Sequence, residues 1–194
     1  LLGNAKRAFL GISDTSPSFG VDILIGEQGL FSRFAHLEYA DDGLLEIARH
    51  YFEKLQYPEA EKVYERLVQK YPLSEWAELA AYQLAVTAFK QVRGVEYDQA
   101  PLMKARRFFN TYRNQYPRGV HIESVREHLA EISEMEAQHD LTVAKYYLRE
   151  SRPEAAIYYL REVRRNNSNT KAAVEARQIF EQMENYRGLE DEAA

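Results

Sequence analysis

The fold is decided by the stretch YFEKLQYPEAEKVYERLVQKYPLSEWAELA, residues 51–80. Within it, Ala60, Tyr64 and Leu67 recur at the spacing of one helix face, and Pro72 follows where the helix must stop. Another helical face precedes Ala60 in the sequence and is formed by Leu44, Ile47, Ala48 and Tyr51. The stretch therefore predicts a helix–turn–helix unit, in which a small alanine lets two helices approach and an aromatic ring fills the space beside it.

The same columns recur twice further along the chain. The aligned structural repeat positions are Ala60, Tyr64 and Pro72, then Ala105, Phe109 and Pro117, then Ala155 and Tyr159. A helix–turn–helix that repeats in this way is typical of tetratricopeptide (TPR) proteins, whose repeat is about 34 residues long. We therefore predict an all-α TPR fold, a right-handed superhelical solenoid of about nine or ten helices.

We expect a single TPR domain over residues 1–194. An N-terminal loop, with Gly and Pro at residues 11–20, and a degenerate or capping helix pair at residues 20–40 would occupy residues 1–43. The expected order after it is repeat 1 at 44–74, repeat 2 with an insertion between its helices at 75–119, a long helix (or two nearly collinear ones) plus repeat 3 at 120–169, a capping helix at 170–187, and a frayed tail at 188–194.

Composition excludes several classes of protein. The 194 residues carry a formal net charge of −5, which argues against binding nucleic acid through phosphate neutralisation. There is no cysteine, so disulfides and cysteine-ligated metals are excluded. The sequence contains no HExxH, phosphate-loop or GxSxG motif. We expect no catalytic residues, no cofactor, no metal site and no small-molecule substrate, and therefore not an enzyme.

TPR arrays commonly bind a peptide on the concave face formed by their first helices. In the repeat frame, the candidate concave-face residues are Arg49, Phe52, Gln83, Lys90 and Tyr147. The segment 104–118 contains five basic residues and no acidic one. A basic patch for an acidic partner would consist of Arg106, Arg107, Arg113 and Arg118. The alternative is that the aromatics of this segment are core residues and the arginines are ordinary surface residues.

Three segments resemble the BamD family of outer-membrane assembly lipoproteins: residues 51–80, 108–117 (FFNTYRNQYP) and 141–163 (LTVAKYYLRESRPEAAIYYLREV). The repeat motif of that family is matched by Tyr57, Ala60, Tyr64, Tyr71, Pro72, Ser74 and Ala77. Its long helix ends in a VAxYYL motif, which is matched by residues 143–148. The resemblance covers roughly residues 44–186. The family usually has five repeats, whereas this chain shows three clear ones and a degenerate first, as in a shortened or divergent member.

The resemblance implies a protein on the periplasmic face of the outer membrane, held there by a lipidated cysteine that we expect upstream of Leu1. It implies protein partners, namely a BamA-like Omp85 barrel protein and nascent outer-membrane proteins, and membrane contact only through the lipid anchor. In the family, the N-terminal repeats are associated with substrate recognition and the C-terminal ones with BamA. The alternative is another periplasmic or soluble TPR adaptor, such as a YbgF-like cell-envelope coordinator, that binds a peptide on its concave face.

Overall fold

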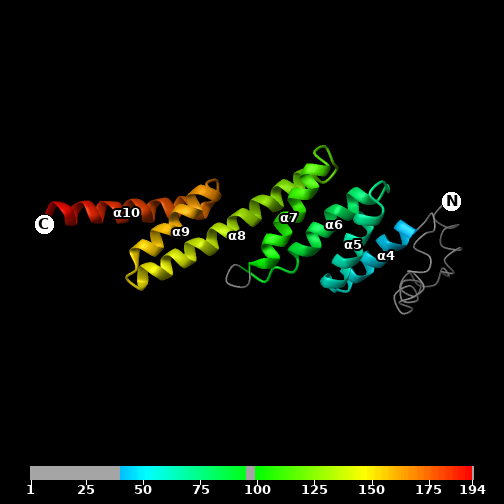
Figure 1. The fold of residues 1–194 in the computed structure, drawn as a ribbon, viewed down its shortest axis with the longest axis horizontal. Coiled ribbons are helices and arrows are strands. Elements are labelled where there is room, and N and C mark those ends of the chain that lie inside the picture. The colour runs from blue at the N-terminus through cyan, green and yellow to red at the C-terminus, as the bar shows by residue number, and fades with distance from the viewer. Residues whose placement is uncertain (1–39, 95–98, 194) are drawn as a thin grey trace. The chain divides into compact units, whose positions relative to one another are not determined.

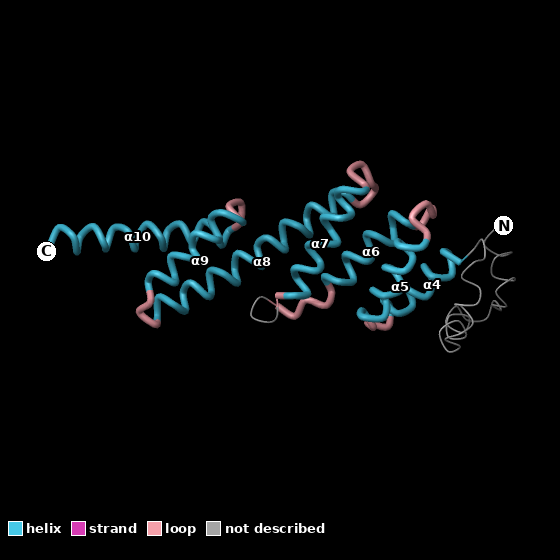
Figure 2. The backbone as a smooth tube through the Cα atoms, viewed as in Figure 1, coloured by secondary structure: helices cyan, strands magenta, loops and turns pink. Residues whose placement is uncertain are grey.

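The computed structural model describes residues 40–94 and 99–193, and this part of the chain is helical (Figure 1). Its helices are α4 (Ala40–Glu53), α5 (Tyr57–Lys70), α6 (Ala77–Phe89), α7 (Ala100–Gln115), α8 (Ile122–Arg149), α9 (Pro153–Asn166) and α10 (Lys171–Ala193). Turns join them, and the described residues contain no strand (Figure 2). The all-α prediction is therefore confirmed for these residues. The expected loop at 11–20 and helix pair at 20–40 lie outside them.

The chain divides into two compact units, residues 1–92 with 100–122, and residues 93–99 with 123–194. Among the described residues, the first contains α4, α5, α6 and α7, and we call it the N-terminal unit. The second contains α8 from Glu123 onward, α9 and α10, and we call it the C-terminal unit. Each has buried hydrophobic residues of its own.

In the N-terminal unit, each helix packs against the next one along the chain. Ala48, Ala60 and Ala80 are fully buried in one cluster, and their small side chains allow the backbones of α4, α5 and α6 to approach closely. Tyr64 and Leu67 fill the remaining space in that cluster. The buried face of α7 consists of Leu102, Ala105, Phe109 and Tyr112. In each of these helices, a buried alanine allows a neighbouring helix to approach, and the larger buried residues of the same face fill the space around it.

The C-terminal unit is built on α8, a single helix of 28 residues. The sequence left open one long helix or two nearly collinear ones, and the structure contains one. Its buried Ala137, Leu141 and Ala144 pack with residues of α9 and α10. Glu134 of α8 also accepts hydrogen bonds from the backbone N–H groups of Lys171 (2.7 Å) and Ala172 (3.0 Å). This carboxylate therefore satisfies two donors at the start of α10.

Two helix pairs are joined by the same turn, although their sequences differ. After α4, Leu55 adopts a left-handed conformation (φ 59°), and after α8, Ser151 does so (φ 57°). In each case, the N–H of the next residue bonds to a carbonyl five positions back: Gln56 to Tyr51 at 2.9 Å, and Arg152 to Tyr147 at 2.9 Å. This is the Schellman arrangement that ends a helix. The next helix starts two residues after the left-handed residue.

This turn also sets which residues of the second helix are buried. Counted from Leu55, the buried alanine of α5 is the fifth residue, Ala60; counted from Ser151, it is Ala156. The sequence columns, which align Ala155 with Ala60, predict Ala155 and Tyr159 at these positions. The structure instead buries Ala156 and Leu160 completely and leaves Ala155 and Tyr159 partly exposed. The predicted positions are one residue too early in α9. Ala60 and Ala155 each follow a proline by two residues, but that proline is the second residue of α5 and the first residue of α9.

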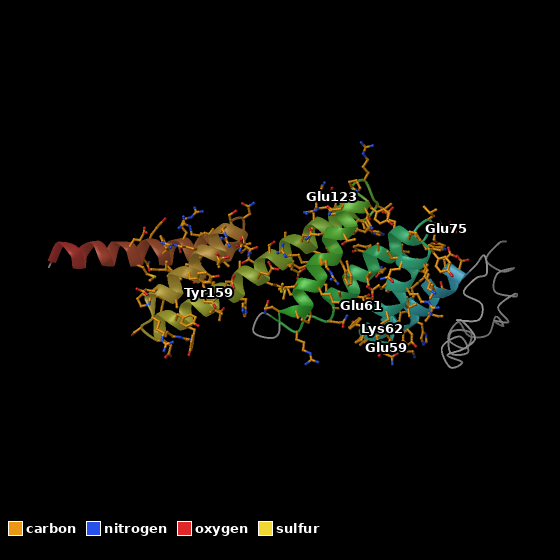
Figure 3. The ribbon with its side chains drawn as sticks, in the orientation of Figure 1. Glu59, Glu61, Lys62, Glu75, Glu123 and Tyr159 are labelled. Carbon is orange, nitrogen blue, oxygen red and sulfur yellow. The ribbon has the colours of Figure 1, made fainter. Side chains whose placement is uncertain are left out.

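Polar contacts link helices that are distant in sequence within the N-terminal unit. The indole N–H of Trp76 donates to Asp42 at 2.6 Å, which joins the turn before α6 to the start of α4. The buried carboxylate of Glu61 on α5 (Glu61 is labelled in Figure 3) pairs with Lys104 of α7 and accepts a hydrogen bond from Gln91 at 2.7 Å. Both contacts hold the helix stack in register, because each joins elements about 30 or more residues apart.

The turn after α7 is closed by a network around Gly119. The hydroxyl of the buried Tyr112 donates to Glu78 at 2.7 Å and accepts the N–H of His121 at 3.1 Å. The N–H of Val120 also donates to Glu78, at 2.6 Å. Burial, together with the hydrogen bond to Glu78, raises the pKa of Tyr112 to about 12, so its hydroxyl stays a donor. A Cβ on Gly119 would lie 2.5 Å from the Tyr112 oxygen and 2.6 Å from the Glu78 carboxylate.

We expect Gly119→Ala to destabilise the N-terminal unit by about 1–3 kcal/mol, because the Tyr112 ring is buried and has little room to move. The measurement is urea unfolding followed by circular dichroism. In a Tyr112→Phe background, the clashing oxygen is absent, so the same substitution is expected to cost less. An equal cost in both backgrounds would contradict the clash at the hydroxyl.

Candidate partner-binding surfaces

A cavity of about 370 Å³ opens on the N-terminal unit. Its walls come from three helices and consist of Leu45, Arg49, Phe52 and Glu53 of α4, Tyr64 of α5, and Leu79 and Gln83 of α6. We call it the α4–α6 pocket. Three of the five residues predicted for the concave face, Arg49, Phe52 and Gln83, therefore lie together.

Helix periodicity explains this grouping. Leu45, Arg49 and Phe52 are four and three residues apart, so they share a face of α4. Leu79 and Gln83 are four apart and share a face of α6. The neighbouring positions, such as Leu44, Ala48 and Ala80, are used for the core. The pocket is thus formed by faces of α4 and α6 that lie beside the residues which these helices contribute to the shared core with α5.

The pocket combines apolar walls with polar groups of both charges. Arg49 forms an ion pair with Glu46 at 3.4 Å, and more than half of each side chain is exposed. Burial raises the pKa of Tyr64 to about 12, an effect that Arg49 opposes and that Glu46 and Glu53 reinforce. The Tyr64 hydroxyl is therefore neutral at physiological pH. Such a lining can hold an apolar side chain and hydrogen-bond a polar one beside it.

Four residues of the pocket are not among the five candidate concave-face residues: Leu45, Glu53, Tyr64 and Leu79. Tyr64 was assigned to the repeat core, and it does lie there, but its ring also lines the pocket. Extending the face of Gln83 back by one turn would have identified Leu79.

Lys90 follows the last residue of α6, is exposed, and does not line the pocket. Tyr147 belongs to α8 in the C-terminal unit.

The basic patch predicted on α7 is only partly on one face. Arg106 and Arg113 are seven residues apart and share a helix face, whereas Arg107 lies beside it, with its guanidinium 5.3 Å from the ring of Phe108. Arg118 lies in the turn after α7. Arg106 is half-buried and the other three arginines are exposed.

Four tyrosines form a cluster on the C-terminal unit, and we call it the tyrosine patch: Tyr146 and Tyr147 of α8, and Tyr158 and Tyr159 of α9. The rings of Tyr147 and Tyr159 are stacked, with centroids 5.7 Å apart (Tyr159 is labelled in Figure 3). Tyr146 and Tyr158 meet them edge-on and are 49% and 61% exposed. Sequence analysis identified only Tyr147 as a partner-binding residue. Exposed aromatic clusters of this kind are common at the centres of protein interfaces.

The described residues contain no group of three or more histidine or acidic side chains placed to hold a metal ion. Within the same part of the chain, no helix is long and apolar enough to cross a membrane.

Asp140 of α8 lies in an unfavourable electrostatic setting. Partial burial raises the pKa of its carboxyl group, and Glu136 and Glu162 raise it further, while His139 lowers it. A carboxyl group whose pKa is higher in the folded than in the unfolded state reduces stability when it is ionised. Its cost is therefore present at neutral pH and disappears as the pH falls below the usual aspartate pKa of about 3.9.

We expect Asp140→Asn to raise the unfolding temperature at pH 7. The gain in the free energy of unfolding should be less than about 1 kcal/mol, because the carboxyl group is only half-buried and is screened by solvent. The gain is expected to vanish near pH 3.5. Glu127→Gln, at an exposed position on the same helix, is the matched control and should have no such pH-dependent effect. A gain that persisted at low pH would show that ionisation of Asp140 is not its cause.

The sequence was also compared with known proteins. Residues 28–194 match the YfiO family, which is described as "Outer membrane lipoprotein". A comparison with curated proteins gave no significant match. The family match covers far more than half of the chain and agrees with the BamD-like motifs in its repeats. The chain therefore belongs to the YfiO, or BamD, family of outer membrane lipoproteins.

Proposed function

We propose that this protein is a non-catalytic scaffold that acts in the assembly and insertion of outer-membrane β-barrel proteins, as part of a BAM-type complex. Membership of an outer membrane lipoprotein family supports this role. The helix pairs of the described residues also support it, because repeated helix pairs commonly present surfaces to other proteins. Its place is the periplasmic face of the outer membrane, where a lipid anchor upstream of the chain holds it.

The fold that goes with this role is a right-handed TPR solenoid. The repeated Schellman turns after α4 and α8 support it, because they start the following helix at the same distance in both pairs. The three buried sets with equal spacing also support it: Ala60, Tyr64 and Leu67; Ala105, Phe109 and Tyr112; and Ala156, Leu160 and Val163.

The observation that carries the proposed binding activity is the α4–α6 pocket. It is formed mainly by α4 and α6, which are the first helices of the two N-terminal repeats in the predicted frame. Phe52, Leu45 and Leu79 offer an apolar seat, while Arg49, Glu53 and Gln83 offer hydrogen bonds and charge at its sides. An extended segment of a nascent outer-membrane protein alternates apolar and polar side chains, and it can use both kinds of wall.

The C-terminal unit would bind the second partner, a BamA-like Omp85 protein. The tyrosine patch supplies exposed aromatic area with few rotatable bonds, which favours a stable interface. The arginines of the basic patch, Arg106, Arg107, Arg113 and Arg118, would meet acidic partner groups and increase the rate of association.

The first test measures binding of a labelled peptide copied from a β-strand of an outer-membrane barrel protein. Phe52→Ala and Arg49→Ala are each expected to weaken binding by about tenfold, the effect of losing an interface anchor. Leu73→Ala and Lys62→Ala are the matched controls, because Leu73 is 98% exposed and neither residue lines the pocket. Equal affinities for the variants and the controls would remove the pocket from the proposed function.

The second test concerns the tyrosine patch. Tyr146→Ala combined with Tyr158→Ala is expected to weaken capture of the BamA-like partner by at least tenfold, since both rings are exposed and contribute little to the core. Peptide binding at the α4–α6 pocket should be unchanged. Undiminished partner capture by this variant, with its unfolding temperature preserved, would contradict the assignment of the patch.

A further inference from the structure

A second cavity, of about 380 Å³, lies on the C-terminal unit and has a very different lining. It is lined by Arg161, Arg164 and Arg165 of α9, Ser168 of the turn, and Ala173 and Arg177 of α10. We call it the arginine pocket. Neither the family match nor the proposed function assigns a role to it.

The arrangement of α9 and α10 brings these arginines together. Arg161, Arg164 and Arg165 share a face of α9, because they are three and four residues apart. The ring of the buried Phe180 lies beneath two of them, with the guanidinium carbons of Arg164 and Arg161 at 5.1 and 5.9 Å from its centroid. Cation–π contact of this kind restrains a guanidinium plane and leaves its N–H groups free to bind.

Positive charge in this pocket is only partly neutralised. Arg165 pairs with Glu162 at 2.8 Å. Within the part of the chain that the structure describes, Arg161, Arg164 and Arg177 form no ion pair. Four guanidinium groups around one cavity repel one another, and a bound anion would relieve that repulsion.

The lining favours a compact oxyanion over a peptide. The four arginines donate hydrogen bonds and accept none, and the Ser168 hydroxyl can donate or accept. Ala173 is the remaining lining residue and is small and apolar. There is no apolar seat for a peptide side chain, in contrast to the α4–α6 pocket with its Leu45, Phe52 and Leu79. Arginine forks match the oxygens of a phosphate group in pairs and bind them more strongly than a neutral donor does.

We propose that the arginine pocket is a binding site for a phosphate group, supplied by the headgroup of a membrane phospholipid. An outer membrane lipoprotein works beside a surface that carries such groups, so the ligand is present at high local concentration. Free inorganic phosphate has the same chemistry and would occupy the same site. The inference is independent of the peptide-binding activity proposed for the N-terminal unit.

The test is co-sedimentation of residues 1–194 with vesicles of phosphatidylglycerol and phosphatidylcholine. Arg161→Gln, Arg164→Gln and Arg177→Gln, combined in one variant, are expected to weaken binding by at least tenfold. The matched control removes the same three charges elsewhere on the C-terminal unit, through Arg126→Gln, Arg149→Gln and Arg152→Gln at exposed positions. It should retain most of the binding. Unfolding temperatures and circular dichroism establish that both variants fold.

Inorganic phosphate, titrated against the same proteins and followed by the NMR signals of the arginine Nε–H groups, distinguishes the two sources of the ligand. Phosphate binding that the pocket variant loses, together with vesicle binding, supports the lipid headgroup. Phosphate binding without vesicle binding supports the same site with free phosphate as its ligand. Equal loss of vesicle binding in the pocket variant and the control would overturn the proposal, because it would reflect total charge alone. Binding of an oligoglutamate peptide, with no binding of phosphate or vesicles, would also overturn the proposal, because the pocket would then select a carboxylate-bearing peptide.

Discussion

The structure depends above all on close contact between helices at buried alanines. Ala48, Ala60, Ala105 and Ala156 have no exposed surface, and Ala48 and Ala60 lie in one cluster with Ala80, where α4, α5 and α6 meet. A larger side chain at any of these positions would separate the helices, and the large residues beside them would lose their partners. Because the contact occupies one face of each helix, the remaining faces are left for polar contacts and for binding.

Those remaining faces differ between the two units, and so does their chemistry. In the N-terminal unit, α4 and α6 leave a pocket with apolar walls and mixed charges around a neutral tyrosine hydroxyl. In the C-terminal unit, α8 and α9 present four tyrosines, while α9 and α10 surround a cavity with arginines. One packing rule therefore supports three surfaces that suit different ligands.

Much of this could be predicted from residue spacing alone. Helical periodicity and the Ala–aromatic columns predicted an all-α chain, and they identified Arg49, Phe52 and Gln83 as neighbours on one surface. The repeat motifs also identified the family correctly. The buried register of α9 was missed by one residue, because the alignment matched Ala155 to Ala60, whereas the left-handed residue of each turn places Ala156 at that position.

The sequence by itself determined the helices, their approximate limits and the family, because each depends on interactions between residues near one another along the chain. Only the tertiary structure decided which polar side chains meet. The contact of Glu61 with Lys104, the network around Gly119, the stacking of Tyr147 on Tyr159, and the convergence of Arg177 with the arginines of α9 all join residues on different helices or turns. Local periodicity predicts which face of a helix is buried. It contains no information on the rotation and offset of one helix against another, and those two quantities decide which side chains share a site.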